Sequence, residues 1–134
     1  MNRSEVLKIV ESARKKGNTP DLRRADLSYV NLADLNLEDT DLSDANLTGT
    51  ILTEADLAGA NLTGVDLTGA NLYGADLWNA NLTDANLENA NWYGLRIDDL
   101  LPSSQITLTP TIGGWDLRIG LWHGTPDQLR SLSL

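Results

Sequence analysis

The chain contains no cysteine and no phenylalanine, and His123 is its single histidine. Without cysteine there is no disulfide, thiol nucleophile or thiolate metal site, and one histidine excludes the common zinc ligand sets. We expect His123 to lie in a turn at residues 122–124, where no serine or cysteine partner is evident. The glycine-rich phosphate loop and the EF-hand pattern are also missing. The sequence therefore predicts no catalytic residue, no metal site, no cofactor and no enzyme.

Long apolar runs are absent as well. No stretch approaches the roughly 18 to 20 apolar residues that a membrane-spanning helix needs. The first residues, Asn2 to Glu5, are polar or charged and lack the apolar core of a signal peptide. We therefore expect a cytoplasmic protein that makes no contact with a membrane.

Basic residues are scarce in the middle of the chain. Residues 20–99 hold 15 acids against three arginines, a net charge of −12, whereas residues 1–19 carry a net charge of +3. The whole chain has a formal net charge of −9. A surface this acidic repels phosphate backbones, so direct binding to nucleic acid is not expected.

What the chain has instead is a leucine at every fifth position from Leu22 to Leu87. A small residue stands two positions before most of these leucines, and Asp or Asn stands directly before all but Leu52. A period of five matches neither the 3.6 residues of a helical turn nor the alternation of a straight strand. The chain must turn a corner about once per repeat, which is typical of a solenoid whose core forms only when coils stack.

The successive units ADL, VNL, LNL, TDL and ANL, each followed by two mostly polar or glycine residues, resemble those of the pentapeptide-repeat family over residues 20 to about 99. The chain looks like the short, cyanobacterial-type members. The resemblance implies an all-β solenoid, a right-handed quadrilateral parallel β-helix of about four coils with four repeats in each. It also implies that the central leucine and the small residue two before it both point inward.

Packing considerations agree with that arrangement. Residues twenty apart would stack about 4.8 Å apart, as neighbouring strands do. Four leucines per layer fill a narrow interior, so the other inward position must be small. Leu35 and Leu95 break this rule, in the first and last coils, where capping segments can fill a wider cross-section. The Asp or Asn before each leucine is expected to hydrogen-bond backbone at the corner, which is a structural role.

Two terminal segments flank the repeats. Residues 1–19 are predicted to form a capping helix, with Asn2 and Glu5 at its start, Gly17 at its end, and Val6 and Val10 on one stripe. A partner-binding helix is the other interpretation of this segment. Residues 20–99 form the β-helix domain.

Residues 100–134 predict two short strands joined around Pro110–Gly114, followed by a brief helix from Thr125. This segment is either a C-terminal cap or a dimerisation element. The protein is accordingly expected to be a monomer or an end-to-end homodimer through that segment.

Three aromatic residues stand at outward positions and form a possible partner-binding patch. Tyr73 and Tyr93 are twenty residues apart, so they would stack on consecutive coils, and Trp78 holds the equivalent place on the next face. Aromatic clusters in an acidic surface are typical anchors of protein interfaces. Stacking on a surface ladder and burial under the C-terminal segment are the alternatives. Ile51, which replaces Asp or Asn, either lies under a cap or adds to the patch.

The leading hypothesis is a non-catalytic, acidic structural or interaction protein that presents a rigid rod to a protein partner. The alternative comes from the resemblance, because one branch of the family looks like duplex DNA in shape and charge and protects or inhibits DNA gyrase. That branch commonly has phenylalanine at the central position and has longer chains, and both features count against the alternative.

Overall fold

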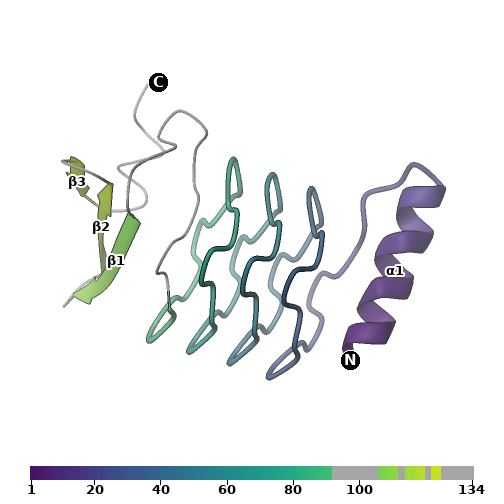
Figure 1. The fold of residues 1–134 in the computed structure, drawn as a ribbon, viewed down its shortest axis with the longest axis horizontal. Coiled ribbons are helices and arrows are strands. Elements are labelled where there is room, and N and C mark those ends of the chain that lie inside the picture. The colour runs from purple at the N-terminus through teal and green to yellow at the C-terminus, as the bar shows by residue number, and fades with distance from the viewer. Residues whose placement is uncertain (92–105, 112–113, 120–121, 125–134) are drawn as a thin grey trace.

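The computed structural model describes residues 1–91, 106–111, 114–119 and 122–124. Helix α1 (Arg3–Lys15) comes first and lies at one end of a stack of coils that begins at residue 20 (Figure 1). Three short strands follow in the chain: β1 (Ile106–Thr111), β2 (Gly114–Ile119) and β3 (Trp122–Gly124). They lie beyond the coils, at the end opposite α1 (Figure 1).

The coils have a period of twenty residues and four sides. Parallel bridges join Asp21 to Asp41, Asp26 to Asn46 and so on, up to Asn71 with Asn91, always between residues twenty apart. Four repeats therefore complete one turn. We call the sides face 1 (residues 20–22), face 2 (25–27), face 3 (30–32) and face 4 (35–37), each recurring every twenty residues. The corner after each face bears the same number. In the first coil, corner 3 consists of residues 33–34 and corner 4 of residues 38–39, and both recur every twenty residues.

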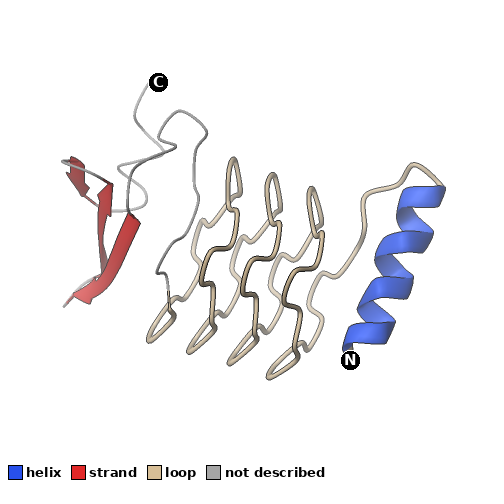
Figure 2. Cartoon of the chain, in the orientation of Figure 1, coloured by secondary structure: helices blue, strands red, loops and turns tan. Residues whose placement is uncertain are grey.

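The expectation of an all-β solenoid needs correction in one respect, because the coils contain isolated bridges rather than continuous strands (Figure 2). Each corner takes two of every five residues. Each side therefore has three extended residues and forms one bridge to the next coil, which is too short for a continuous strand. The hydrogen bonds between coils nevertheless run in both directions. For example, the Leu22 N–H donates to Asp41 O at 2.8 Å, and the Asp41 N–H donates to Pro20 O at 2.9 Å.

The corners are held by the Asp or Asn side chain that precedes each leucine, as predicted. The Arg23 N–H donates to Asp21 Oδ1 at 3.1 Å, and the same bond recurs at twelve further corners. This Asx hydrogen bond mimics a backbone turn and fixes the two corner residues. The ladder of Asp and Asn is therefore structural.

The second residue of each corner has a left-handed backbone, which sequence reasoning did not predict. Its φ lies near +60°, for instance 58° at Arg24 and 62° at Gly49, and Ala25 N–H closes the turn on Leu22 O at 3.2 Å. A β-turn with positive φ at its third residue favours Gly, Asn or Asp. The signal was present as the run of these residue types at every fifth position from 34 to 89, interrupted only by Glu54.

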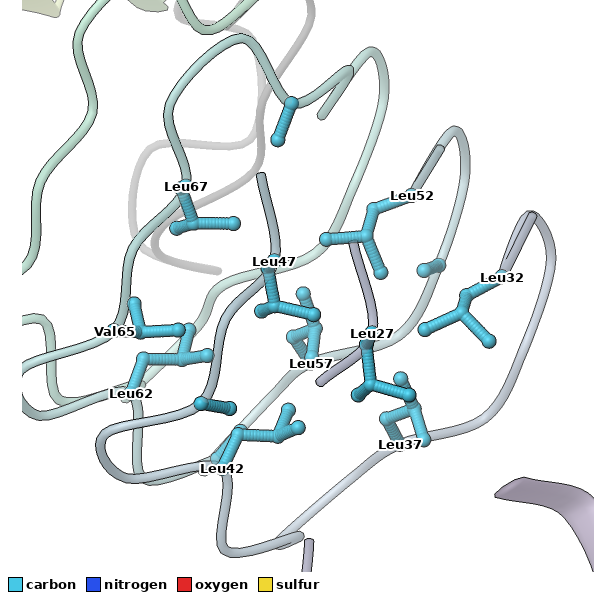
Figure 3. Packing of buried hydrophobic residues seen from close by; sticks show 14 of the residues in the cluster. Leu27, Leu32, Leu37, Leu42, Leu47, Leu52, Leu57, Leu62, Val65 and Leu67 are labelled. Atoms are coloured by element: carbon cyan, nitrogen blue, oxygen red, sulfur yellow. The ribbon is translucent and has the colours of Figure 1, made fainter. Parts of the chain in front are cut away.

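The leucines fill the centre of the coils. Those from Leu22 to Leu77 are at most 2 % exposed, and Figure 3 shows Leu27, Leu47 and Leu67 one above another, with their side chains directed inward. The small residues line the same interior, with Ala45, Ala55, Ala60, Ala70 and Ala75 almost wholly buried. Leu35, the large residue at a small inward position of the first coil, is 4 % exposed. It belongs to the same buried cluster as Val6 and Val10 of α1. Leu95 lies outside the described residues.

Two threonines at small inward positions provide a matched pair. The Thr50 hydroxyl donates to Leu27 O at 2.7 Å, whereas the buried Thr40 hydroxyl has no hydrogen-bond partner among the described residues. An unpaired buried hydroxyl costs about 1 to 3 kcal/mol, so Thr40→Val should raise the free energy of unfolding by about 1 kcal/mol. Thr50→Val should lower it by about the same amount, because that hydroxyl is paired. Urea denaturation of both variants checks the prediction, and a loss of stability in Thr40→Val would contradict it.

Helix α1 lies against the open edge of the first coil. Asn2 Oδ1 accepts the Glu5 N–H at 2.9 Å, and Gly17 has a φ of 72°, as the end signals predicted. Arg3 Nη1 donates to Asn31 O and Ala33 O at 3.2 and 2.9 Å. Arg14 reaches the next side, where its guanidinium donates to Asn36 O and Glu38 O at 3.0 and 3.1 Å.

The C-terminal strands form one antiparallel sheet in the order β1-β2-β3. Ile106 pairs with Ile119 and Thr111 with Gly114, so the two predicted strands are present. The predicted connection around Pro110–Gly114 is too long, because Pro110, Thr111 and Gly114 themselves belong to the strands. The predicted turn at residues 122–124 is wrong, because His123 pairs with Arg118 in β3. The sequence Trp122-His123-Gly124 was too short to show the alternation of a strand. The predicted final helix from Thr125 lies outside the described residues.

Candidate interaction surface

The outward aromatic residues are mounted on corners whose backbone is fixed on two sides. The Tyr73 N–H donates to Asn71 Oδ1 at 3.1 Å, and the Trp78 N–H donates to Asp76 Oδ1 at 2.9 Å. Their carbonyl groups accept from the preceding coil, Tyr73 O from the Glu54 N–H and Trp78 O from the Gly59 N–H. The two side chains therefore leave the rod from rigid positions rather than from loops.

Both aromatic side chains are open to solvent. Tyr73 is 42 % exposed and Trp78 is 43 % exposed. They stand at corners 3 and 4 of the same coil, with the three residues 75–77 of face 4 between them. Tyr93, the third residue of the predicted patch, lies outside the described residues.

Three further large apolar side chains are exposed among the residues with described burial, namely Met1, Tyr29 and Ile51. Ile51 is 39 % exposed at the centre of face 3, one coil before Asn71. We call Ile51, Tyr73 and Trp78 the apolar patch. Tyr29 is 77 % exposed at corner 2, and its ring lies against Gly49 of the next coil, where a Cβ atom would clash. Sequence reasoning missed Tyr29; the signal was a bulky residue followed twenty positions later by glycine.

Carboxylates are concentrated beside this patch. In the first three coils, face 4 and its two corners, residues 33–39, 53–59 and 73–79, contain six acids and no base. These acids are Asp34, Glu38, Asp39, Glu54, Asp56 and Asp76. Face 2 and its corners on the opposite side, residues 23–29, 43–49, 63–69 and 83–89, hold five acids and two arginines. The charge of the rod is therefore unevenly distributed around its axis.

The two arginines of face 2 line a surface hollow at corner 1. It measures about 460 Å³ and is bordered by Asp21, Arg23, Arg24, Ser43 and Asp44. Arg23 Nη2 lies 2.8 Å from Asp21 Oδ2, and the side-chain hydrogen bond from Arg23 lowers the pKa of Asp21 to about 2. The pair is exposed and neutralises itself, which leaves the hollow without a strong field for a charged ligand.

The part of the chain that the structure describes contains no group of three His, Asp or Glu side chains placed to hold a metal ion. Within the same residues, no helix has the length and apolar character needed to cross a membrane. Neither observation identifies a site beyond the surface just described.

The twenty-residue period, the four bridged sides and the inward leucines define a solenoid built from five-residue units. A family model described as pentapeptide repeats matches residues 21–59 and 40–79. The chain belongs to the pentapeptide-repeat family, whose members form right-handed quadrilateral β-helices.

Three solved structures from cyanobacteria are similar to this chain. The pentapeptide repeat protein Rfr23 from Cyanothece 51142 is 38 % identical over 58 % of this chain and 54 % of that chain, with a TM-score of 0.57. HetL from Nostoc sp. strain PCC 7120, involved in heterocyst differentiation regulation, is 29 % identical over 61 % and 51 %, with a TM-score of 0.32. The pentapeptide repeat protein alr5209 from Nostoc PCC 7120 is 30 % identical over 69 % and 95 %, with a TM-score of 0.26.

The chain thus spans about half the length of Rfr23 and of HetL. No curated protein matches its sequence.

Proposed function

We propose that this protein is a non-catalytic interaction protein that acts in the cytoplasm, a rigid acidic rod whose apolar patch contacts a protein partner. The observation that carries the proposal is the exposure of Tyr73 and Trp78, 42 % and 43 %, on corners fixed by hydrogen bonds. Tyrosine and tryptophan are enriched among the residues that dominate binding energy at interfaces. Rigid mounting lowers the entropy that is lost when such side chains are immobilised in a complex.

Replacing both aromatic residues of the patch tests the proposal. Tyr73→Ser with Trp78→Ser should remove most partner capture in a pulldown from the source cell, because hot-spot residues cost about 2 kcal/mol or more each when truncated. The thermal unfolding midpoint should change little, since both side chains lie on the outside of the coils and neither belongs to the buried core. Quantification of the captured protein by mass spectrometry gives the readout.

Tyr29→Ser supplies the matched control. Tyr29 is 77 % exposed and stands at corner 2 of the first coil, whereas Tyr73 and Trp78 stand at corners 3 and 4 of the third coil. Its loss should leave capture unchanged. If the double variant captures as much protein as the original chain, or loses its fold, Tyr73 and Trp78 are not the contact.

A second candidate function is mimicry of duplex DNA toward a DNA-binding enzyme such as gyrase. Residues 21–91 hold thirteen acids and two arginines, a net charge of −11. With about 4.8 Å per coil, this segment is about 17 Å long, or about one net charge per 1.5 Å. Duplex DNA carries about one charge per 1.7 Å of its axis, so the linear charge density is similar.

A supercoiling assay with DNA gyrase tests this alternative. A mimic should inhibit the enzyme at micromolar protein, and added salt should weaken the inhibition because the contacts are electrostatic. No effect on supercoiling at that concentration would remove DNA mimicry and leave the protein-interaction proposal untouched.

We further infer that α1 is an end cap rather than a partner-binding helix. In the second coil, Ile51 O and Thr53 O accept hydrogen bonds from Leu32 and Asp34 N–H of the first coil. Their equivalents in the first coil, the carbonyls of residues 31 and 33, accept from Arg3 instead. The helix therefore replaces the donors that a preceding coil would supply, which protects an edge that would otherwise invite pairing.

A further inference from the structure

We propose that face 4 with the apolar patch binds a basic segment of its partner, an extended stretch of peptide rich in arginine or lysine. This inference rests on the proposed interaction function and names the chemistry of the partner. Its basis is the coincidence, on one side of the rod, of two exposed aromatic residues with six carboxylates and no base in residues 33–39, 53–59 and 73–79.

The acids of face 4 form a column between the two aromatic corners. Asp56 and Asp76 bridge each other at the centre of the face, in consecutive coils. Both are partly exposed, while Asp34, Glu38, Asp39 and Glu54 at the flanking corners are exposed. Asp76 lies in the same coil as Tyr73 and Trp78, so a cation held by Asp76 would stand on the face between the two aromatic corners.

The spacing suits one cationic group. The three extended residues 75–77 separate the two aromatic corners, about 10 Å at the rise of an extended chain. A guanidinium or ammonium group interacts with an aromatic face within about 6 Å of the ring centre. A cation over Asp76 would lie on the face between the two aromatic corners, which favours a basic partner over a purely apolar one.

Two cations of the helix contact the edge of this side. Arg3 donates to Ala33 O, and Arg14 donates to Asn36 O, Asn36 Oδ1 and Glu38 O, all in the first coil. Both belong to the contact between α1 and the coils. Among the described residues, the ion pairs are those of Arg23 with Asp21 and Asp41, so none involves Glu54, Asp56 or Asp76.

The opposite side of the rod offers a matched control. Asp26 and Asp66 occupy the centre of face 2, in the same repeat position as Asp56 and Asp76. Asn replaces Asp at this position without loss of the corner bond, as Asn71 shows by accepting the Tyr73 N–H. Asp56→Asn with Asp76→Asn and Asp26→Asn with Asp66→Asn therefore remove equal charge while each corner keeps its hydrogen bond.

The test is binding of a synthetic peptide of alternating arginine and serine, followed by amide shifts in NMR spectra and by calorimetry at low salt. Shifts should concentrate on residues 33–39, 53–59 and 73–79. Asp56→Asn with Asp76→Asn should weaken peptide binding about tenfold, because it removes two negative charges that attract the arginines of the peptide. Asp26→Asn with Asp66→Asn should weaken binding less than about twofold, because those charges lie on the opposite side of the rod. Tyr73→Ser with Trp78→Ser should also weaken binding, and a glutamate-serine peptide should not bind.

Equal losses in the two Asn pairs, shifts spread over all four faces, or no binding of the basic peptide would each overturn the proposal. If a cellular partner is still captured, and Tyr73→Ser with Trp78→Ser still abolishes that capture, only the assigned partner chemistry is wrong. If neither the peptide nor a cellular partner depends on these two residues, the interaction function of the patch fails as well.

Discussion

Replacement of Ala70 by leucine should lower the free energy of unfolding by about 1 to 3 kcal/mol, because the interior of the coils has no room for three more carbon atoms. Ala70 is fully buried in the third coil, and the leucines on either side, Leu67 and Leu72, are fully buried as well. Denaturant unfolding monitored by far-ultraviolet circular dichroism gives the free energy, and the slope of the transition shows whether the fold is retained.

Ala33→Leu is the control for this prediction. Ala33 stands at an outward corner and is partly exposed, so the same enlargement meets solvent there. Its effect on stability should be within about 0.5 kcal/mol. Equal destabilisation by the two substitutions would contradict the assignment of Ala70 to the inside.

Removal of the two helix arginines should also destabilise the protein, by about 1 to 3 kcal/mol in Arg3→Gln with Arg14→Gln. Together these arginines make five hydrogen bonds to the edge of the first coil. Because neighbouring coils stabilise one another, loss of the end contact should first appear as faster amide exchange in the first coil. Hydrogen exchange and urea denaturation check these two outcomes.

Lys8→Gln with Lys15→Gln is the charge-matched comparison. Both lysines are exposed residues of the same helix, so this variant tests the change in charge alone. We expect its stability and its exchange in the first coil to stay close to those of the original chain. If the two double variants behave alike, charge rather than edge hydrogen bonding holds the helix, and the cap mechanism is wrong.

Much of the architecture could be predicted because the repeat encodes it locally. A leucine every fifth residue, a small residue two before it and Asp or Asn between them specify the inside, the centre of a face and the corner. The structure bears this out in the buried leucines from Leu22 to Leu77 and in the bond from the Arg23 N–H to Asp21. Inward residues beyond them, such as Leu82 and Ala85, are half-buried, so the coverage is weaker in the last described coil.

Other features could not be predicted with the same rules. Arg3 and Arg14 lie eleven residues apart, three helical turns, on the stripe of Val6 and Val10. Their role depends on which backbone groups the first coil leaves open, and this becomes visible only when the coils are stacked. The strand at Trp122–Gly124 is equally dependent on its context, because three residues gain strand character only through pairing with β2.

The candidate surface was partly visible beforehand. Tyr73 and Trp78 were predicted as outward residues, and the structure exposes both. Three features could be recognised only from the three-dimensional positions: the separation of Tyr73 and Trp78 by face 4, the exposure of Ile51 and the exposure of Tyr29. The accumulation of carboxylates on that face also emerges only when residues twenty apart are brought into one column.

The sequence by itself determined the period, the corners and the contents of the interior, since each depends on residues no more than five apart. The tertiary structure alone decided which side of the rod carries the aromatic residues together with the acids, and how the open edge is satisfied. The physical reason is that stacking joins residues twenty positions apart. The charge and the exposed apolar area of a face are sums over several coils, so they cannot be read from any single repeat.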